Sequence, residues 1–173
     1  QILQSGKDAS MVHRRASVKA YQKFDPVYFC FCNMAQFKQY KLGFDRMFHI
    51  EEVKDESAHV QQAAIDAQQA ELATIKEGVT AEEVAAAANV VYAERGYATG
   101  YRTGRSIGTA YLEAPELKAG DKTILRAGMT FAVDGGISID GVTAGRIGDS
   151  IVVTETGFEY LTEYPRQILL SKG

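Results

Sequence analysis

Two charged residues stand where the wall of a binding site is expected. Arg105 lies in a short segment bracketed by Gly104 and Gly108, and Asp134 directly follows the apolar stretch at residues 130–133. A guanidinium and a carboxylate presented in this way can form charge-assisted hydrogen bonds with groups of opposite charge on a small molecule. Each also has a plainer interpretation, because Arg105 can serve packing and Asp134 can form a turn at the end of a strand.

A histidine, an aspartate and a tyrosine nearer the start of the chain are further candidates. His13 follows a turn sequence, Asp45 directly precedes Arg46, and Tyr40 lies five residues before Asp45. Because a histidine titrates near neutral pH, His13 can carry a proton in catalysis. His13 can instead cap a turn, and Asp45 can simply pair with Arg46. Tyr40 can equally belong to the core or to the wall of a site.

The pattern of apolar residues predicts strands at the start of the chain and helices after them. Residues 27–32 form a continuous apolar run, and residues 37–50 are a second strand candidate, with a hairpin turn between them at residues 33–36. From Lys54 the apolar residues follow a helical period, which ends before Gly78. The first part of the chain therefore predicts a hairpin followed by a long helix.

A second helix and a return to short strands complete the pattern. Thr80 and Glu83, three residues on, form a capping box, and the helix that they open ends near Arg95. The later strands are expected around Arg105 and at residues 130–133, 137–139 and 150–154. This order of elements favours an α+β fold with a mostly antiparallel sheet.

The composition is that of one globular domain. The chain has 173 residues, of which 46% are hydrophobic, and a formal net charge of −3, so it has enough apolar side chains for one sizeable core. The slightly acidic balance gives no broad attraction for nucleic acid or an anionic membrane, and no apolar run is long enough to span a bilayer. We therefore expect a cytoplasmic protein that binds neither of them.

The two cysteines are two residues apart in the sequence. Cys30 and Cys32 lie in the first apolar run, where a strand would place them on the same face. Because a disulfide between strand neighbours has poor geometry, we expect two buried thiols in a reducing compartment. A metal site there would need further ligands, and none stands nearby in the sequence.

Four motifs occur in a characteristic order: Gly104-Arg105-Ser106-Ile107-Gly108, Glu113-Ala114-Pro115, the segment from Leu125 to Asp134, and Arg146-Ile147-Gly148-Asp149. In this order and spacing they resemble the C-terminal half of the creatinase/aminopeptidase P/methionine aminopeptidase family, peptidase M24. The resemblance implies an α+β pita-bread fold, with a mostly antiparallel curved sheet and helices packed on one side. It also implies a homodimer and one catalytic-type domain over residues 1–173, truncated at the N-terminus.

The metal-dependent members of this family bind two divalent ions through two aspartates, one histidine and two glutamates. The matching positions are Cys30 or Cys32, Gly43, Arg105, Asp134 and Gly148. Because hard divalent ions need several oxygen or imidazole donors that converge on one point, one aspartate beside a cationic arginine does not suffice for a pair of them. We therefore predict no catalytic metal and no other cofactor.

Creatinase is a metal-free member, and it uses a histidine base and two carboxylates that grip a cationic guanidino group. His13 matches that histidine, and Asp45 and Asp134 match the carboxylates. The ectoine hydrolase branch shares the altered Gly-X-Ser-Ile-Gly motif. The resemblance thus predicts a metal-independent hydrolase that cleaves a C–N bond in a small charged substrate. In this hydrolase His13 is catalytic, and the substrate is bound by Asp45, Arg105, Asp134 and Tyr40.

Two other functions stay open at this stage. The first is a non-catalytic peptidase-like module, in which the cleft binds a protein or is idle. Scattering of His13, Asp45 and Asp134 over the surface would favour this module, whereas their meeting in one pocket would favour an enzyme. The second is an Xaa-Pro metallopeptidase of the aminopeptidase P or prolidase type, which would require a bound divalent ion.

Overall fold

The computed structural model describes residues 2–11, 13–35, 37–98 and 100–171. Two short 3-10 helices, Gly6–Ser10 and Phe37–Gln39, connect the first strands. The strands and α-helices are, in chain order, β1 (Ile2–Ser5), β2 (Pro26–Ala35), β3 (Lys41–Ile50), α1 (Asp55–Thr74), α2 (Ala81–Glu94), β4 (Gly104–Ser106), β5 (Glu113–Leu117), β6 (Thr130–Ile139), β7 (Thr143–Val153), β8 (Phe158–Tyr160) and β9 (Leu169–Ser171).

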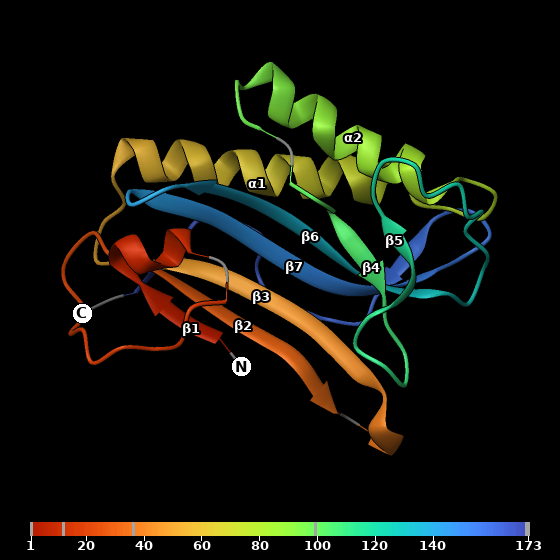
Figure 1. Cartoon of the computed structure of the whole chain (residues 1–173), viewed down its shortest axis with the longest axis horizontal. Helices are drawn as coiled ribbons and strands as arrows, with labels where there is room; N and C mark the ends of the chain where they lie inside the picture. The colour runs from red at the N-terminus through yellow and green to blue at the C-terminus, as the bar shows by residue number, and fades with distance from the viewer. Residues whose placement is uncertain (1, 12, 36, 99, 172–173) are drawn as a thin grey trace.

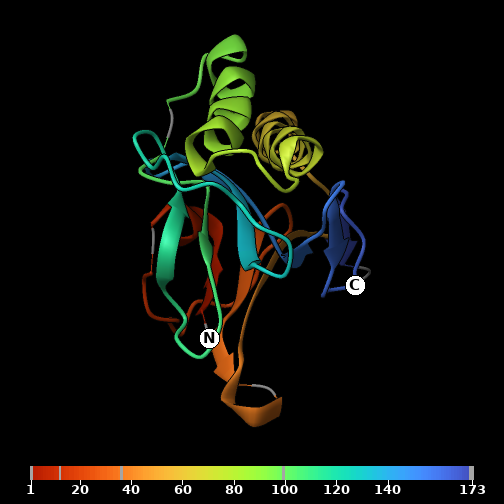
Figure 2. The same cartoon turned by 90° about the vertical axis from the view of Figure 1, so that its right-hand side faces the viewer.

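The described strands form one sheet that is covered by helices on one face. Its path runs β1-β2-β3-β7-β6-β4-β5, with β8 paired to β7 and β9 paired to β3. All of these pairs are antiparallel except β3 with β9. Both α-helices lie above the sheet in Figure 1, and the view from its end in Figure 2 shows them on the same side. The predicted α+β fold with a mostly antiparallel sheet is therefore confirmed.

Both predicted helices form where their sequence signals stand. α1 begins directly after Lys54, and the turn that follows it includes Gly78, whose φ of +90° suits glycine. α2 begins at the predicted capping box, in which the Glu83 carboxylate accepts a hydrogen bond from the N–H of Thr80 at 2.8 Å. In the part of the chain that the structure describes, no helix is long and apolar enough to cross a membrane.

Two glycines let the backbone of α1 lie directly against the sheet. A Cβ on Gly135 of β6 would stand 2.1 Å from the carbonyl oxygen of Ala64, and one on Gly145 of β7 would stand 2.4 Å from that of Val60. Any side chain at these positions would push the helix away from the strands. The apolar layer between helices and sheet continues from this contact.

This packing explains one difference from the sequence prediction. Separate strands were expected at residues 130–133 and 137–139, with Asp134 as a possible turn former at the end of the first. In the structure β6 is unbroken from Thr130 to Ile139 and pairs with β7 along its whole length. Glycine at position 135 thus serves a close helix contact and not a turn, which the local sequence does not reveal.

The first hairpin also differs from its prediction. The turn was expected at residues 33–36, but β2 continues to Ala35, and the 3-10 segment Phe37–Gln39 follows it before β3. The pairing of β2 with β3 shifts register between Phe31 and Met34. The strand therefore extends beyond the apolar run at residues 27–32. The last residue of the predicted turn, Gln36, lies outside the described residues.

Cys30 and Cys32 are joined in a disulfide, so the prediction of two buried free thiols is wrong. Their Cα atoms are 5.6 Å apart, which lies within the usual range for disulfides. The prediction assumed a regular strand, whereas the regular register with β3 ends directly before Cys32, at Phe31. Cys30 is buried and Cys32 is only half-buried.

One backbone register pair, Asp45 opposite Gly148, joins β3 to β7 in the described chain. Side chains complete this join. The Ser150 hydroxyl accepts a hydrogen bond from the N–H of Gly43 at 3.0 Å and donates to its carbonyl at 2.7 Å. Arg46 donates to the carbonyl of Gly148 at 2.7 Å. The two strands are therefore held together largely by side-chain to backbone hydrogen bonds.

Asp149 on β7 is the centre of a buried ion cluster next to this join. Its carboxylate pairs with Arg46 at 2.8 Å and with Arg166 at 3.0 Å, and it accepts a hydrogen bond from Gln68 of α1 at 3.1 Å. In the described chain Asp149 forms no ion pair with Arg146 of the same strand. Residues 146 and 149 are three apart on one strand and so face opposite sides of the sheet.

We expect Gly135→Ala to destabilise the protein by about 1–3 kcal/mol or more, because its Cβ meets rigid backbone of α1 and not a flexible side chain. Urea denaturation followed by circular dichroism measures the change. Gly157→Ala is the matched control, since a Cβ there meets no atom within 4 Å. Equal free energies of unfolding for the two variants would contradict the packing role of Gly135.

We expect Ser150→Ala to lower the free energy of unfolding by about 1–3 kcal/mol, because the N–H and carbonyl of Gly43 lose their buried partner. Ser138→Ala on neighbouring β6 is the control, since Ser138 is exposed and its hydroxyl binds only a side chain. The same denaturation experiment compares both. If Ser150→Ala costs no more than the control, the side-chain join between β3 and β7 is unimportant.

Candidate active site

Four of the five predicted site residues line one cleft of about 470 Å³. They are His13, Asp45, Arg105 and Asp134. The fifth, Tyr40, is not part of the lining, and 56% of it is exposed. The structure therefore brings together a histidine, two carboxylates and a guanidinium from separate parts of the sequence, and it leaves Tyr40 outside this group.

The two carboxylates belong to one row across three neighbouring strands. Asp45 of β3 is opposite Gly148 of β7, which is in turn opposite Asp134 of β6. A Cβ on Gly148 would stand 2.8 Å from an oxygen of each carboxylate. The two acids therefore converge above a residue that has no side chain, at the position that matches the last glutamate of the family.

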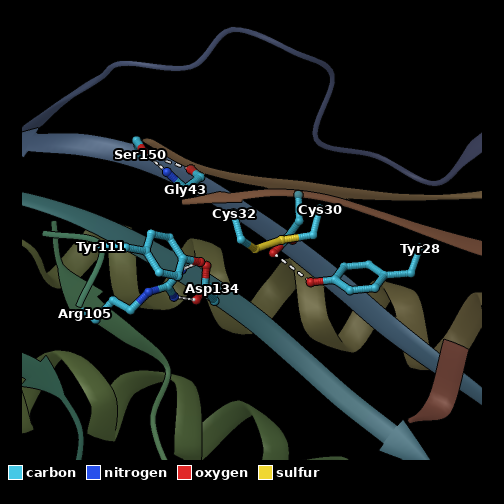
Figure 3. The surroundings of a disulfide bond; sticks show 9 residues. Tyr28, Cys30, Cys32, Gly43, Arg105, Tyr111, Asp134 and Ser150 are labelled. Carbon is cyan, nitrogen blue, oxygen red and sulfur yellow. Dashed lines mark hydrogen bonds and ion pairs between the residues drawn. A yellow bond between two sulfur atoms is a disulfide. The ribbon is translucent and has the colours of Figure 1, made fainter. Parts of the chain in front are cut away.

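Arg105 is held in place by two other residues of the cleft (Figure 3). Its guanidinium forms an ion pair with Asp134 and donates a hydrogen bond to the hydroxyl of Tyr111. It also lies over the Tyr111 ring, 4.3 Å from the ring centre. The guanidinium that was expected to bind a substrate carboxylate is thus already bound to a carboxylate of the protein, and it is almost fully buried.

Asp45 lies in a less polar environment than Asp134. Its Oδ2 accepts a hydrogen bond from the hydroxyl of Tyr28 at 3.3 Å, and its buried Oδ1 has no hydrogen-bond partner in the described chain. Burial, followed by the charge of Asp134, raises the pKa of the Asp45 carboxyl to about 8. This group is therefore mostly protonated at neutral pH, while Asp134 faces Arg105.

His13 lies at the exposed edge of the cleft. Its φ of +60° falls in the left-handed region, which residues other than glycine rarely adopt. Such backbone strain is often found where a side chain must be presented in a particular direction. The position fits a group that exchanges protons with water and with a molecule in the cleft.

Sequence reasoning missed a second arginine of the cleft. Arg146 of β7 lines it and donates a hydrogen bond to the hydroxyl of Ser138 at 2.5 Å, and its guanidinium lies 5.8 Å from the ring centre of Tyr28. In the described part of the chain Arg146 forms no ion pair. Strand alternation was the available signal, because Arg146 lies two residues before Gly148 and so shares its face.

Sequence reasoning also missed a buried acid on α1. Glu71 is fully buried, and its carboxyl lies near the hydroxyl of Thr103. Burial raises the pKa of this carboxyl well above its usual value. The polar residues around it on α1 gave no signal, since a glutamate on such a helix is ordinarily solvated.

The residues of the cleft do not fit a pair of divalent ions. The positions that match the family's ligands carry a half-cystine, two glycines, Arg105 and Asp134, and the guanidinium of Arg105 lies on the one carboxylate among them. Among the described residues, no three histidine, cysteine, aspartate or glutamate side chains are grouped so that they could hold a metal ion. Hard cations need more oxygen or imidazole donors than this.

The relationship to known proteins agrees with the four sequence motifs. Residues 1–155 match metallopeptidase family M24. The chain belongs to this family. The fold described above is that of family M24. The solved structure of a member of this family confirms the predicted pita-bread architecture. That structure, an X-Pro aminopeptidase from Thermotoga maritima MSB8, superposes with a TM-score of 0.91 at 30% sequence identity over 98% of this chain and 48% of the other.

Two relatives with similar sequences have different names. An uncharacterized peptidase of Bacillus subtilis is 32% identical over 171 residues, which are 98% of this chain and 48% of the relative. Agropine synthesis cyclase of Rhizobium rhizogenes is 41% identical over 103 residues, 58% of this chain and 26% of the relative. The chain thus spans less than half of the length of each of these two relatives. A closer relation to the creatinase and ectoine hydrolase branches stays a prediction.

The raised pKa of Asp45 predicts a pH dependence of stability. The folded protein holds the proton of this carboxyl more tightly than the unfolded chain, whose pKa is near 3.8. The contribution of this bound proton to the free energy of unfolding is fully present below about pH 3.8, and it is lost as the pH rises through about 8. Asp45→Asn mimics the protonated carboxyl, so it should become more stable relative to wild type from pH 4.5 to 8.5, by at most about 1.4 kcal/mol per pH unit.

Urea denaturation at several pH values measures this difference. Asp140→Asn, the same change at an exposed turn residue, is the control. A difference between Asp45→Asn and wild type that stays constant over this range would show that Asp45 is ionised throughout.

Proposed function

We propose that the cleft hydrolyses a C–N bond in a small charged substrate without a pair of metal ions. The observation that supports this proposal is the ion pair between Arg105 and Asp134 at two positions that hold metal ligands in metal-dependent relatives. A fixed guanidinium neutralises the carboxylate there and offers positive charge to a developing oxyanion. Arg105 thereby supplies positive charge at this position, and no metal ligands are needed for it.

In this proposal His13 moves the proton. It takes a proton from a water molecule, the water oxygen attacks the carbon of the C–N bond, and the proton then passes to the departing nitrogen. The bond from carbon to nitrogen breaks as the bond from carbon to oxygen forms, so no oxidant or other reagent is required. The exposed place of His13 at the edge of the cleft lets it exchange this proton with solvent.

Charged groups of the substrate are bound by the remaining side chains of the cleft. A cationic group beside Asp45 favours the ionised carboxylate and completes a charge-assisted hydrogen bond at its unpartnered Oδ1. A carboxylate group is assigned to Arg146, because Arg146 has no ion pair in the described chain whereas Arg105 is bound by Asp134. The sequence had pointed to Arg105 for this role.

Two observations favour an enzyme over a non-catalytic module. His13, Asp45 and Asp134 line one cleft, which is the arrangement that distinguishes the two possibilities. The similarity to agropine synthesis cyclase supports a small-molecule reaction, since that name describes a synthesis and not the cleavage of a peptide. The proposal therefore places this chain among family members that act on compounds other than peptides.

An Xaa-Pro metallopeptidase is the second candidate, and the names of solved relatives favour it. The X-Pro aminopeptidase of Thermotoga maritima covers nearly the whole chain at 30% identity. Both candidates cleave a C–N bond, and they differ in the requirement for metal and in the substrate. The donor set of the cleft favours the first candidate, because Arg105 and two glycines replace three ligands.

We expect His13→Ala to lower turnover by about 10²–10⁴-fold, the usual contribution of a general base. Nuclear magnetic resonance measures turnover of candidate substrates with and without a strong chelator. The candidates are guanidino, ureido and cyclic amidine acids, together with a dipeptide ending in proline. His59→Ala is the matched control, since His59 is exposed on α1 and does not line the cleft. We expect that one of these acids is turned over, that the chelator does not inhibit this turnover, and that it depends on His13.

Metal analysis by elemental mass spectrometry separates the candidates. Chelator-sensitive cleavage of the proline dipeptide, with stoichiometric divalent ion in the purified protein, would overturn the first candidate and establish the second. Absence of turnover for every compound, in a folded protein, would contradict both and leave the non-catalytic module.

A further inference from the structure

The disulfide between Cys30 and Cys32 lies in the wall of the cleft (Figure 3). Cys32 lines the cleft together with Asp45, Arg105 and Asp134. Cys30 is paired in register with Asp45 across β2 and β3, so the two side chains are neighbours on one face. A reactive bond between two sulfur atoms is therefore part of the same surface as the charged groups of the site.

The two sulfur atoms differ in their access to solvent. Cys32 is half-buried and faces the cleft, whereas only 1% of Cys30 is exposed. Thiol–disulfide exchange begins when a thiolate reaches one sulfur of the bond, so access decides which sulfur is attacked. A small thiol that enters the cleft can reach Cys32 and is kept from Cys30 by the surrounding protein.

We propose that Cys30 and Cys32 form a reversible thiol–disulfide site that reacts with small thiols from the cleft, at Cys32. A thiolate of a small dithiol attacks the sulfur of Cys32, forms a mixed disulfide with it and releases the sulfur of Cys30. The second thiol of the reagent then closes the reagent's own disulfide and releases Cys32. Two electrons and two protons pass from the dithiol to the cysteine pair, and a small disulfide reverses the reaction.

The surroundings can accommodate both states of the pair. Reduction gives Cys30 an S–H donor opposite Asp45, whose Oδ1 lacks a hydrogen-bond partner in the described chain. The register with β3 is interrupted between Phe31 and Met34, so no continuous ladder of hydrogen bonds opposes a small movement of Cys32. The reduced form thus gains a partner for Asp45, and the oxidised form keeps a covalent brace at the irregular part of β2.

Modification of Cys32 places its adduct in the cleft. A mixed disulfide or an alkyl group on this sulfur occupies space beside Asp45 and Asp134, where the substrate is proposed to bind. This consequence rests on the proposed function and predicts that the adduct blocks turnover. The thiol chemistry itself does not depend on that function, so the two can fail separately.

The first test measures the state of the pair by iodoacetamide labelling and intact-protein mass spectrometry. With the labelling done in urea so that the buried Cys30 is also accessible, we expect no label on the protein purified under air, two labels after treatment with dithiothreitol, and none after reoxidation with glutathione disulfide. Two labels before reduction, or two labels that persist after oxidant, would overturn the proposal.

The second test asks which sulfur reacts from the cleft. Cys30→Ser leaves the thiol of Cys32, and Cys32→Ser leaves the thiol of Cys30, so the two variants are matched controls for each other. In the folded state Cys30→Ser should be alkylated at least about tenfold faster, because access governs thiol reactivity. In urea the two rates should agree, which shows that the fold causes the difference. Equal rates in the folded proteins would overturn the assignment of Cys32.

Labelling and turnover together separate this proposal from the proposed function. Reversible labelling with preferred reaction at Cys32, but no turnover of any compound, supports the thiol site and contradicts the hydrolase. If an adduct on Cys32 leaves turnover unchanged, the inference that this sulfur lies beside the bound substrate would be wrong.

Discussion

The pairing of β3 with β7 connects the two halves of the sheet. Arg46 and Asp149 are almost fully buried at this join and pair at 2.8 Å. A buried ion pair is tolerated when further hydrogen bonds satisfy both partners. Arg46 also donates to backbone carbonyls of β3, β7 and the segment after β8, and Asp149 also accepts from Gln68 and Arg166. This network holds the register between the two strands.

Successive strand residues point to opposite faces of the sheet. Where β3 meets β7, one face therefore carries the buried ion cluster and the other carries residues of the cleft. Arg46 and Asp149 point toward the helix layer, where α1 donates a hydrogen bond to Asp149. Their neighbours Asp45 and Gly148 point into the cleft, beside Asp134 of the next strand. A shift of one residue would exchange the two sets. The register of β3 on β7 therefore decides that two carboxylates converge, and with it the electrostatics of the cleft.

Predictions from the sequence succeeded where a signal is local and failed where one residue type serves two purposes. The capping box of Thr80 and Glu83 lies within one turn of chain, and it marked the start of α2 correctly. Gly135 lies between two strands that were expected separately, yet β6 is continuous there and the glycine allows the backbone of α1 to approach it. The pair Cys30 and Cys32 looked like buried thiols, because a regular strand was assumed and the register shift of β2 was not visible.

The α+β class, both helices and the kinds of charge at the site can be predicted from the sequence, because they follow from periodicity, capping residues and residue identity. The order of its motifs was sufficient to indicate the M24 family, to which the chain belongs. The folded structure was needed to show that Arg105 binds Asp134, that Arg146 has no ion pair in the described chain, and that Cys32 faces the cleft. These contacts join residues far apart in the chain, and they depend on strand order and register, which no local pattern encodes.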